Sequence, residues 1–124
     1  LVDQLRAVDN PVVITGDIHA SGVGVVTADP DDPATPAVVP ELVGTSISST
    51  FPSGLVEVFE SAAAAMPSVR YVDARRRGYV VCEVTADDLT ADFRYMASTA
   101  TAEAEVATGA RWVIAAGDPE PRPA

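Results

Sequence analysis

The sequence predicts an α/β sandwich, in which a mixed sheet precedes a set of antiparallel strands. A continuous apolar run at residues 12–14, bounded by proline and glycine, is typical of a strand buried on both faces. The stretch "LVEVFESAAAAMP", residues 55–67, has apolar side chains at helical spacing and ends at a proline. The later stretches "VRYVDA", "GYVVCEVTA" and "LTADFRYMA" alternate with period two, which indicates strands with one buried face. This pattern disfavours a helical bundle and a wholly β domain.

The other elements follow in chain order. Residues 1–10, "LVDQLRAVDN", look like the last turns of an amphipathic helix, so we expect the chain to begin inside a longer protein. Strands are expected in "SGVGVVTA" (residues 21–28) and "VVPELVG" (38–44), and the proline- and aspartate-rich residues 29–37 between them are expected to form a surface loop. The hydroxyl-rich residues 45–54 are expected to form another loop. Turns at residues 76–78 and 87–88 would join the later strands into an antiparallel meander.

The C-terminal part is expected to hold a last strand, "ARWVIAAG", residues 110–117, in which Trp112 fills the core. We predict one segment of a domain over residues 1–117, followed by a flexible, proline-rich tail at 118–124. Cys82 is the single cysteine, so no intrachain disulfide and no thiolate metal cluster can form. Cys82 lies between Val80 and Val84 on the inward face of its strand, where a buried packing thiol is expected.

Composition narrows the classes of partner. The 124 residues carry a formal net charge of -10, with a sequence pI near 4.2. Such a charge opposes binding to nucleic acid or to an anionic membrane surface, and it is easier to reconcile with binding a cation. No apolar run approaches the ~20 residues that a membrane-spanning helix needs.

The triplet Asp17-Ile18-His19 follows the apolar run directly and contains the only histidine. In extended backbone, residues two apart project to the same side, so Asp17 and His19 are expected to reach into one cleft. A carboxylate oxygen and an imidazole nitrogen both bind divalent or trivalent metals, and sites in α/β sheets lie beyond the carboxyl ends of strands. Two ligands do not complete a metal site, and the triplet alone favours an ordinary turn in which His19 is hydrogen-bonded and Asp17 caps a helix or turn.

Three stretches together resemble a known family. "NPVVITGDIHASG" (residues 10–22), "VPELVGTSISS" (39–49) and "VRYVDARRRGYVVCEVTADDLTADFRYM" (69–96) are similar to three consecutive blocks in the C-terminal portion of PhoD-like alkaline phosphatases, of the calcineurin-like metallophosphatase superfamily. The resemblance implies the C-terminal part of a four-layer α-β-β-α sandwich. It also implies that this chain supplies the family's Gly-Asp-x-His motif through Asp17 and His19.

The resemblance further implies metal-dependent hydrolysis of phosphate monoesters or diesters, with iron and calcium as the metals and with export to the cell envelope or beyond. Upstream ligand motifs of the family have no counterpart in these 124 residues. The implied partner is therefore the missing N-terminal half of the same domain, and this chain alone is expected to be an incomplete fragment. The alternative is a non-catalytic, acidic α/β interaction domain in which Asp17 and His19 only shape a turn.

Three further groups of residues were weighed as functional candidates. The hydroxyl groups of the "TSISS" stretch could line the metal cleft or could satisfy their own backbone. The arginine run could hold a phosphate group through forked hydrogen bonds, although a charged run at a turn is usually solvated. The acidic loop lacks the glycine and distal glutamate of a helix-loop-helix calcium site, so a solvated loop is expected there. These groups comprise Thr45, Ser46, Ser48 and Ser49; Arg75, Arg76 and Arg77; and Asp29, Asp31 and Asp32.

Overall fold

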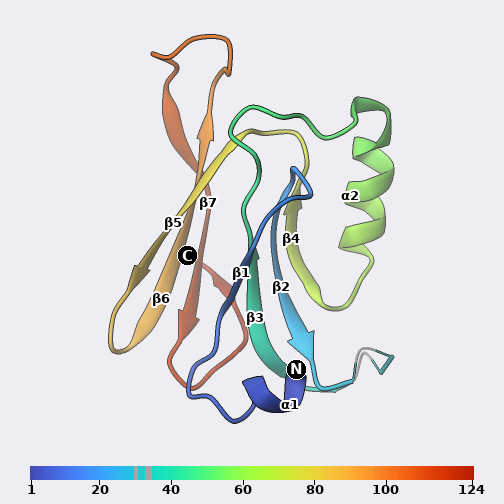
Figure 1. Ribbon diagram of the computed structural model, residues 1–124, viewed down its shortest axis with the longest axis vertical. Coiled ribbons are helices and arrows are strands. Elements are labelled where there is room, and N and C mark those ends of the chain that lie inside the picture. Colours follow the sequence, from blue (N-terminus) through green and yellow to red (C-terminus); the bar gives the residue numbers. More distant parts are fainter. Residues whose placement is uncertain (30, 33–34) are drawn as a thin grey trace.

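The computed structural model describes residues 1–29, 31–32 and 35–124, and it contains two four-stranded sheets packed face to face (Figure 1). The expected loop at residues 29–37 lies partly outside the described residues. The elements are α1 (Val2–Leu5), β1 (Val13–Thr15), β2 (Ser21–Thr27), β3 (Ala37–Val43), η1 (Ser53–Leu55), α2 (Val56–Ala64), β4 (Val69–Asp73), β5 (Gly78–Val84), β6 (Asp88–Met96), β7 (Val106–Ala115) and β8 (Arg122–Pro123).

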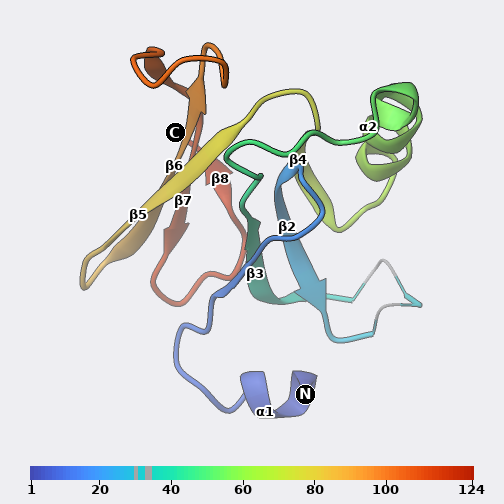
Figure 2. The same ribbon diagram turned by 45° about the horizontal axis from the view of Figure 1, so that its top comes forward.

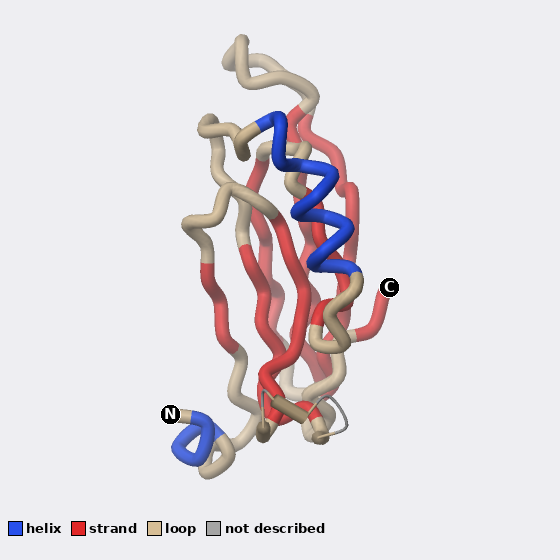
Figure 3. The backbone as a smooth tube through the Cα atoms, turned by 90° about the vertical axis from the view of Figure 1, so that its right-hand side faces the viewer, coloured by secondary structure: helices blue, strands red, loops and turns tan. Residues whose placement is uncertain are grey.

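The first sheet is mixed and the second is antiparallel, as the sequence predicts. In the first sheet the strand order is β1-β3-β2-β4, with β1 parallel to β3 and β2 antiparallel to both of its neighbours. The second sheet has the order β5-β6-β7-β8, and all of its pairs are antiparallel. Helix α2 lies outside the first sheet, against β4 (Figure 3). The described residues thus form three layers of the expected α-β-β-α sandwich: one helix and both sheets.

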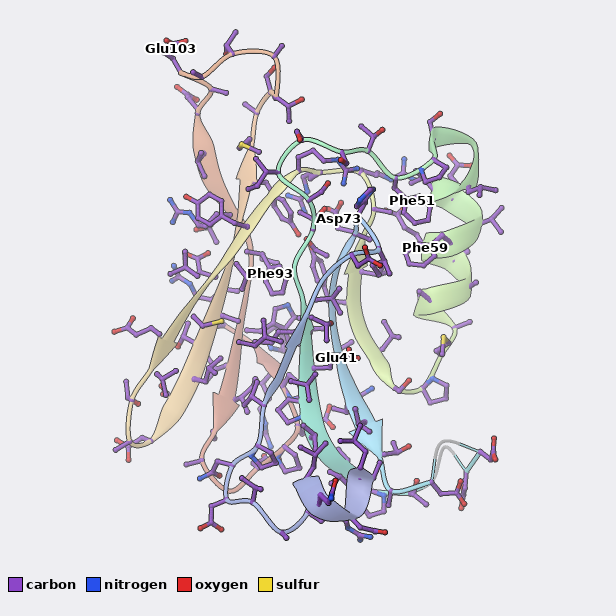
Figure 4. All side chains as sticks on the ribbon, viewed as in Figure 1. Glu41, Phe51, Phe59, Asp73, Phe93 and Glu103 are labelled. Atoms are coloured by element: carbon purple, nitrogen blue, oxygen red, sulfur yellow. The ribbon has the colours of Figure 1, made fainter. Side chains whose placement is uncertain are left out.

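The hydrophobic core lies between the two sheets. Phe93 on β6 is fully buried and points into this space (Figure 4), where it meets Leu42 and Val23 from the first sheet. The Tyr71 ring packs edge-on against Phe93, with their centroids 5.6 Å apart. Trp112 joins the same cluster, which confirms its predicted place in the core. Alternation in β2, β6 and β7 therefore buries one face of each strand against the opposite sheet.

The sequence predicted that a turn joins β4 and β5 within one antiparallel meander. This prediction is wrong, because the two strands belong to different sheets. β4 pairs with β2, whereas β5 pairs with β6. Residues 74–77, hereafter the crossover, carry the chain from the first sheet to the second. The Asp73 carboxylate starts this change of direction by accepting hydrogen bonds from the backbone N–H groups of Arg75 and Arg76, at 2.8 and 2.9 Å. Period-two alternation identified both strands but could not identify their partners.

Gly78 begins β5 at a point of close backbone approach. A Cβ atom added to Gly78 would lie 1.8 Å from the carbonyl oxygen of Arg94 on β6. Next to it, the Arg77 carbonyl accepts a hydrogen bond from the Met96 N–H at 2.9 Å, and the Gly78 N–H donates to the Ser46 carbonyl at 3.1 Å. The end of the crossover is therefore fixed on both sides.

Strand β1 is not buried on both faces, contrary to the sequence expectation. β1 lies at the edge of its sheet, with β3 as its single strand neighbour among the described residues. Ile14 is 62% exposed although its register partner Leu42 is fully buried. An apolar strand needs a neighbour on each side and a cover on each face to be buried, and this part of the molecule supplies only some of them.

The second sheet ends in a strand that the sequence did not predict. Residues 118–124, expected to be a flexible tail, include β8, which pairs with β7 (Figure 2). The Ala124 N–H donates to the Arg111 carbonyl at 3.0 Å, and the Arg122 guanidinium donates to the Asp118 carboxylate at 2.9 Å. Proline prevents a residue from donating its own backbone N–H, but it does not exclude an edge strand.

Cys82 packs partly against the core beside Val80, as expected, whereas Val84 at the end of the same strand is exposed. Burial raises the pKa of the Cys82 thiol, which suits a packing role. In the described residues no helix is long and apolar enough to cross a membrane.

Candidate functional site

The loop of residues 16–20, hereafter the Asp–His loop, joins the carboxyl end of β1 to β2. Asp17 and His19 both have left-handed backbone, with φ values of 75° and 58°. The Ile18 N–H donates to the Gly16 carbonyl at 3.0 Å and closes a tight turn centred on Asp17. A left-handed residue other than glycine costs roughly 1–2 kcal/mol, so two of them in three residues mark a backbone that the surroundings enforce.

The two candidate ligands do not lie in extended backbone, so the geometric reason given for their shared direction is wrong. The left-handed conformation at both positions bends the chain, and simple alternation does not apply. The Asp17 side chain is exposed and His19 is half-buried, so solvent reaches both groups. An accessible carboxylate and an accessible imidazole are suitable donors for a metal ion.

The far end of the Asp–His loop is anchored in a small apolar cluster. Ala20 is fully buried and packs with Val56 of α2 and Ala74 of the crossover. The rings of Phe51 and Phe59 complete the cluster with their centroids 4.7 Å apart, and Figure 4 shows them together beside α2. The loop therefore enters a packed region directly after His19, and this limits how far His19 can move.

Arg77 is the functional candidate that the sequence interpretation placed wrongly. It was grouped with a solvated arginine run, but only 7% of the residue is exposed. Its Nη1 donates to the backbone carbonyl of His19 at 2.6 Å and to the Thr45 hydroxyl at 3.0 Å. Its Nη2 donates to the Ala74 carbonyl at 2.8 Å. Arg77 thus connects the Asp–His loop, the loop after β3 and the crossover.

The other two arginines of the run also have protein partners. Arg75 donates through Nε to the Glu60 carboxylate of α2 at 2.9 Å. Arg76 donates to the Asp73 carboxylate at 2.6 Å, and its guanidinium lies 4.0 Å from the centroid of the Tyr95 ring. These guanidinium groups join elements of the fold, so the interpretation of the run as a phosphate clamp gains no support from their contacts.

Asp73 is the buried anion of this region. Burial alone would raise the pKa of its carboxyl, but hydrogen bonds from the Arg76 backbone and guanidinium and from the Arg75 backbone outweigh burial and lower the pKa. Close to it, the hydroxyl groups of Tyr71 and Tyr95 lie 2.8 Å apart, and burial is the largest cause of the raised pKa of Tyr71. These buried groups stabilise the region where β4 meets the crossover. They do not form part of the exposed surface of the loops.

The hydroxyl groups of the loop after β3 divide between two roles. Thr45 accepts from Arg77 and donates to the Arg76 carbonyl at 3.3 Å, so it belongs to the connection that reaches His19. The Ser46 hydroxyl donates to the Ser49 carbonyl, and Ser48 is exposed. Ser46 therefore satisfies the backbone of its own loop, whereas Thr45 bonds to the crossover.

Acidic residues elsewhere also bond locally. In the acidic loop, the Asp31 N–H donates to the Asp29 carboxylate at 3.0 Å and closes a turn. Within residues 1–29, 31–32 and 35–124, no three His, Cys, Asp or Glu side chains gather closely enough to hold a metal ion. A metal ion held by Asp17 and His19 would therefore need further ligands from outside the described residues.

The fold agrees with what comparison with known proteins shows. A solved structure, described as the structure of PhoD, superposes with a TM-score of 0.81 at 26% sequence identity. The match covers 98% of this chain and 24% of the PhoD chain, so this chain spans about a quarter of that protein. None of the curated proteins matches the sequence significantly.

A family model places the chain among the phosphatases. The model described as PhoD-like phosphatase matches residues 1–93, which include the Asp–His loop, the crossover and most of β6. The chain belongs to the PhoD-like phosphatase family.

Proposed function

We propose that this chain takes part in metal-dependent hydrolysis of phosphate esters and that Asp17 and His19 are two of the metal ligands. The observation that carries the proposal is the accessible Asp–His loop, held in left-handed backbone at the carboxyl end of β1. It lies within the residues that match the phosphatase family. Strained backbone of this kind is concentrated at functional sites, where the surrounding structure holds it in place.

The donor set of the loop fits a metal ion. Asp17 would supply a carboxylate oxygen and His19 an imidazole nitrogen, and resemblance to the family points to iron and calcium. When bound, such metals lower the pKa of a bound water, align it with the phosphorus atom and stabilise the leaving oxygen.

The proposed partner is the missing N-terminal half of the same domain. Two features of the first sheet support this. β1 is an apolar strand with an open edge, and its Ile14 is 62% exposed. At the amino end of β1, an open cavity of about 280 Å³ between the sheets is lined by Val12, Val84 and Ile114, among others. A further strand and its connections would cover this apolar surface. We also propose that the complete protein is exported to the cell envelope or beyond, as the family resemblance implies.

The decisive experiment compares the longer protein with single variants at the two ligands. Asp17→Asn and His19→Gln should each lower kcat/KM for p-nitrophenyl phosphate and for bis(p-nitrophenyl) phosphate by at least about 100-fold, because each removes a ligand from a site that stabilises the transition state. The measurement is hydrolysis after the metals have been restored, together with metal content. Comparison of the two substrates also gives the preference between monoesters and diesters.

Asp87→Asn is the matched control, because Asp87 is exposed in the turn between β5 and β6. We expect wild-type hydrolysis and metal content for this variant. If the Asp17 and His19 variants retained both properties, the chain would instead be a non-catalytic interaction domain or an inactive fragment.

A further inference from the structure

The buried guanidinium of Arg77 makes contacts that concern the backbone of His19 directly. A left-handed histidine turns its carbonyl away from the direction that extended backbone would give it. Arg77 Nη1 meets this carbonyl at 2.6 Å. A charge-assisted hydrogen bond of this length is stronger than one between neutral groups, and burial strengthens it further.

The remaining contacts of Arg77 hold its guanidinium in one orientation. Thr45 and Ala74 accept from Nη1 and Nη2 at 3.0 and 2.8 Å, so the planar group is fixed by segments on two other sides. Its Nε is buried and finds no hydrogen-bond partner in the described part of the chain. Burying a cation with one unsatisfied donor costs free energy. The hydrogen bonds that Nη1 and Nη2 make have to offset this cost.

We propose that Arg77 is a positioning residue for the metal site and that it holds the Asp–His loop in its left-handed conformation through the carbonyl of His19. The proposal depends on the proposed function in one respect, namely that this loop binds metal. Arg77 does not touch metal or substrate. Its role is to keep His19 and Asp17 in the arrangement that binds, as residues behind metal ligands commonly do.

The test uses the longer protein, which carries the further ligands that the proposed function requires, and two measurements in solution. Hydrogen exchange at the Ile18 amide reports the turn that this amide closes with Gly16. Paramagnetic broadening of amide signals during titration with Mn²⁺ alone reports metal binding at the loop. In Arg77→Met we expect faster exchange at Ile18 and Mn²⁺ affinity reduced by about 10-fold or more, the usual loss when a group that orients a ligand is removed.

Arg75→Met is the matched control, because Arg75 lies in the same crossover but is exposed and bonds to Glu60 of α2. It should leave Ile18 exchange and Mn²⁺ broadening at wild-type values. Arg77→Lys keeps the charge without the planar fork and should restore part of both properties. Wild-type values for both measurements in Arg77→Met, or equal effects in Arg77→Met and Arg75→Met, would overturn the proposal.

Two further outcomes are decided by the same experiment. If Arg77→Met does not fold, as seen by circular dichroism, Arg77→Lys takes its place: intermediate values support the positioning role, and wild-type values for both properties overturn it. If the wild-type longer protein shows no Mn²⁺ broadening at the loop and its Asp17→Asn variant behaves identically, the proposed function fails. Ile18 exchange then still decides whether Arg77 holds the loop.

Discussion

The central strand β6 and the edge strand β1 differ in how completely their neighbours cover them. In the second sheet, β6 lies between two partners, and its residues alternate strictly between buried and half-buried positions. In the first sheet, the edge strand β1 consists of only three residues, Val13–Thr15, and Ile14 in its middle is 62% exposed. The comparison teaches that apolar sequence marks surface to be covered, while the cover itself has to come from neighbours. The candidate metal ligands follow the less covered strand.

The largest expected effect is at the better covered strand, β6. Phe93→Ala removes a fully buried ring between the sheets and should lower the free energy of unfolding by about 3–5 kcal/mol. Equilibrium unfolding in urea measures this change. A loss below about 1 kcal/mol would mean that the space between the sheets can collapse around the missing ring.

An intermediate effect is expected at the junction of the sheets. Asp73→Asn removes the charge that faces Arg76, and we expect a loss of about 1–3 kcal/mol at neutral pH. The pKa of Asp73 is lower in the folded chain, so its stabilising contribution is present above its unfolded pKa and is lost as the pH falls through the folded value. The free energy of unfolding, measured in urea from pH 7 to pH 2, should therefore fall less steeply for Asp73→Asn than for wild type below about pH 4.

Asp87→Asn again provides the control for this measurement, because it changes an exposed carboxylate far from the junction. Its acid unfolding should follow the wild-type curve. Parallel curves for all three proteins would show that Asp73 does not contribute to acid unfolding.

The smallest effect is expected at the open edge. Ile14→Ser should change the stability of the 124-residue chain by no more than about 0.5 kcal/mol, because the side chain is mostly exposed. In the longer protein that we propose, the same substitution should destabilise by about 2 kcal/mol or more, because Ile14 would then be buried. Thermal unfolding of both forms measures the difference. An equal effect in the two forms would show that β1 stays uncovered.

Local sequence patterns predicted the elements well and their partners less well. Helical spacing identified α2, and alternation identified β4, β5 and β6, because both signals depend only on nearby residues. The assignment of β4 and β5 to different sheets depends on long-range pairing, which no local period encodes. The short strand β8 was not predicted, because the stretch that contains it is rich in proline. Its pairing with β7 also depends on distant residues.

The candidate site was predictable in its residues but not in its geometry. Asp17 and His19 were found by their chemistry and by resemblance, and their role as ligands stays a prediction. Their left-handed backbone has no signal in the sequence beyond the tolerance of aspartate and histidine for that conformation. Burial of Arg77 was missed, because three adjacent arginines look alike in the sequence and only the fold of the crossover shows that one of them is buried.

The close approach of the backbones at Gly78 has a consequence for these three arginines. Because Gly78 has no side chain, the backbone at the start of β5 lies directly against the Arg94 carbonyl of β6. Arg77, whose own carbonyl is bonded to Met96, is thereby drawn into the interior, while Arg75 remains outside. The position of Gly78 thus determines which of the three adjacent arginines is buried. Inserting or deleting one residue in this run would give the interior position to a different arginine.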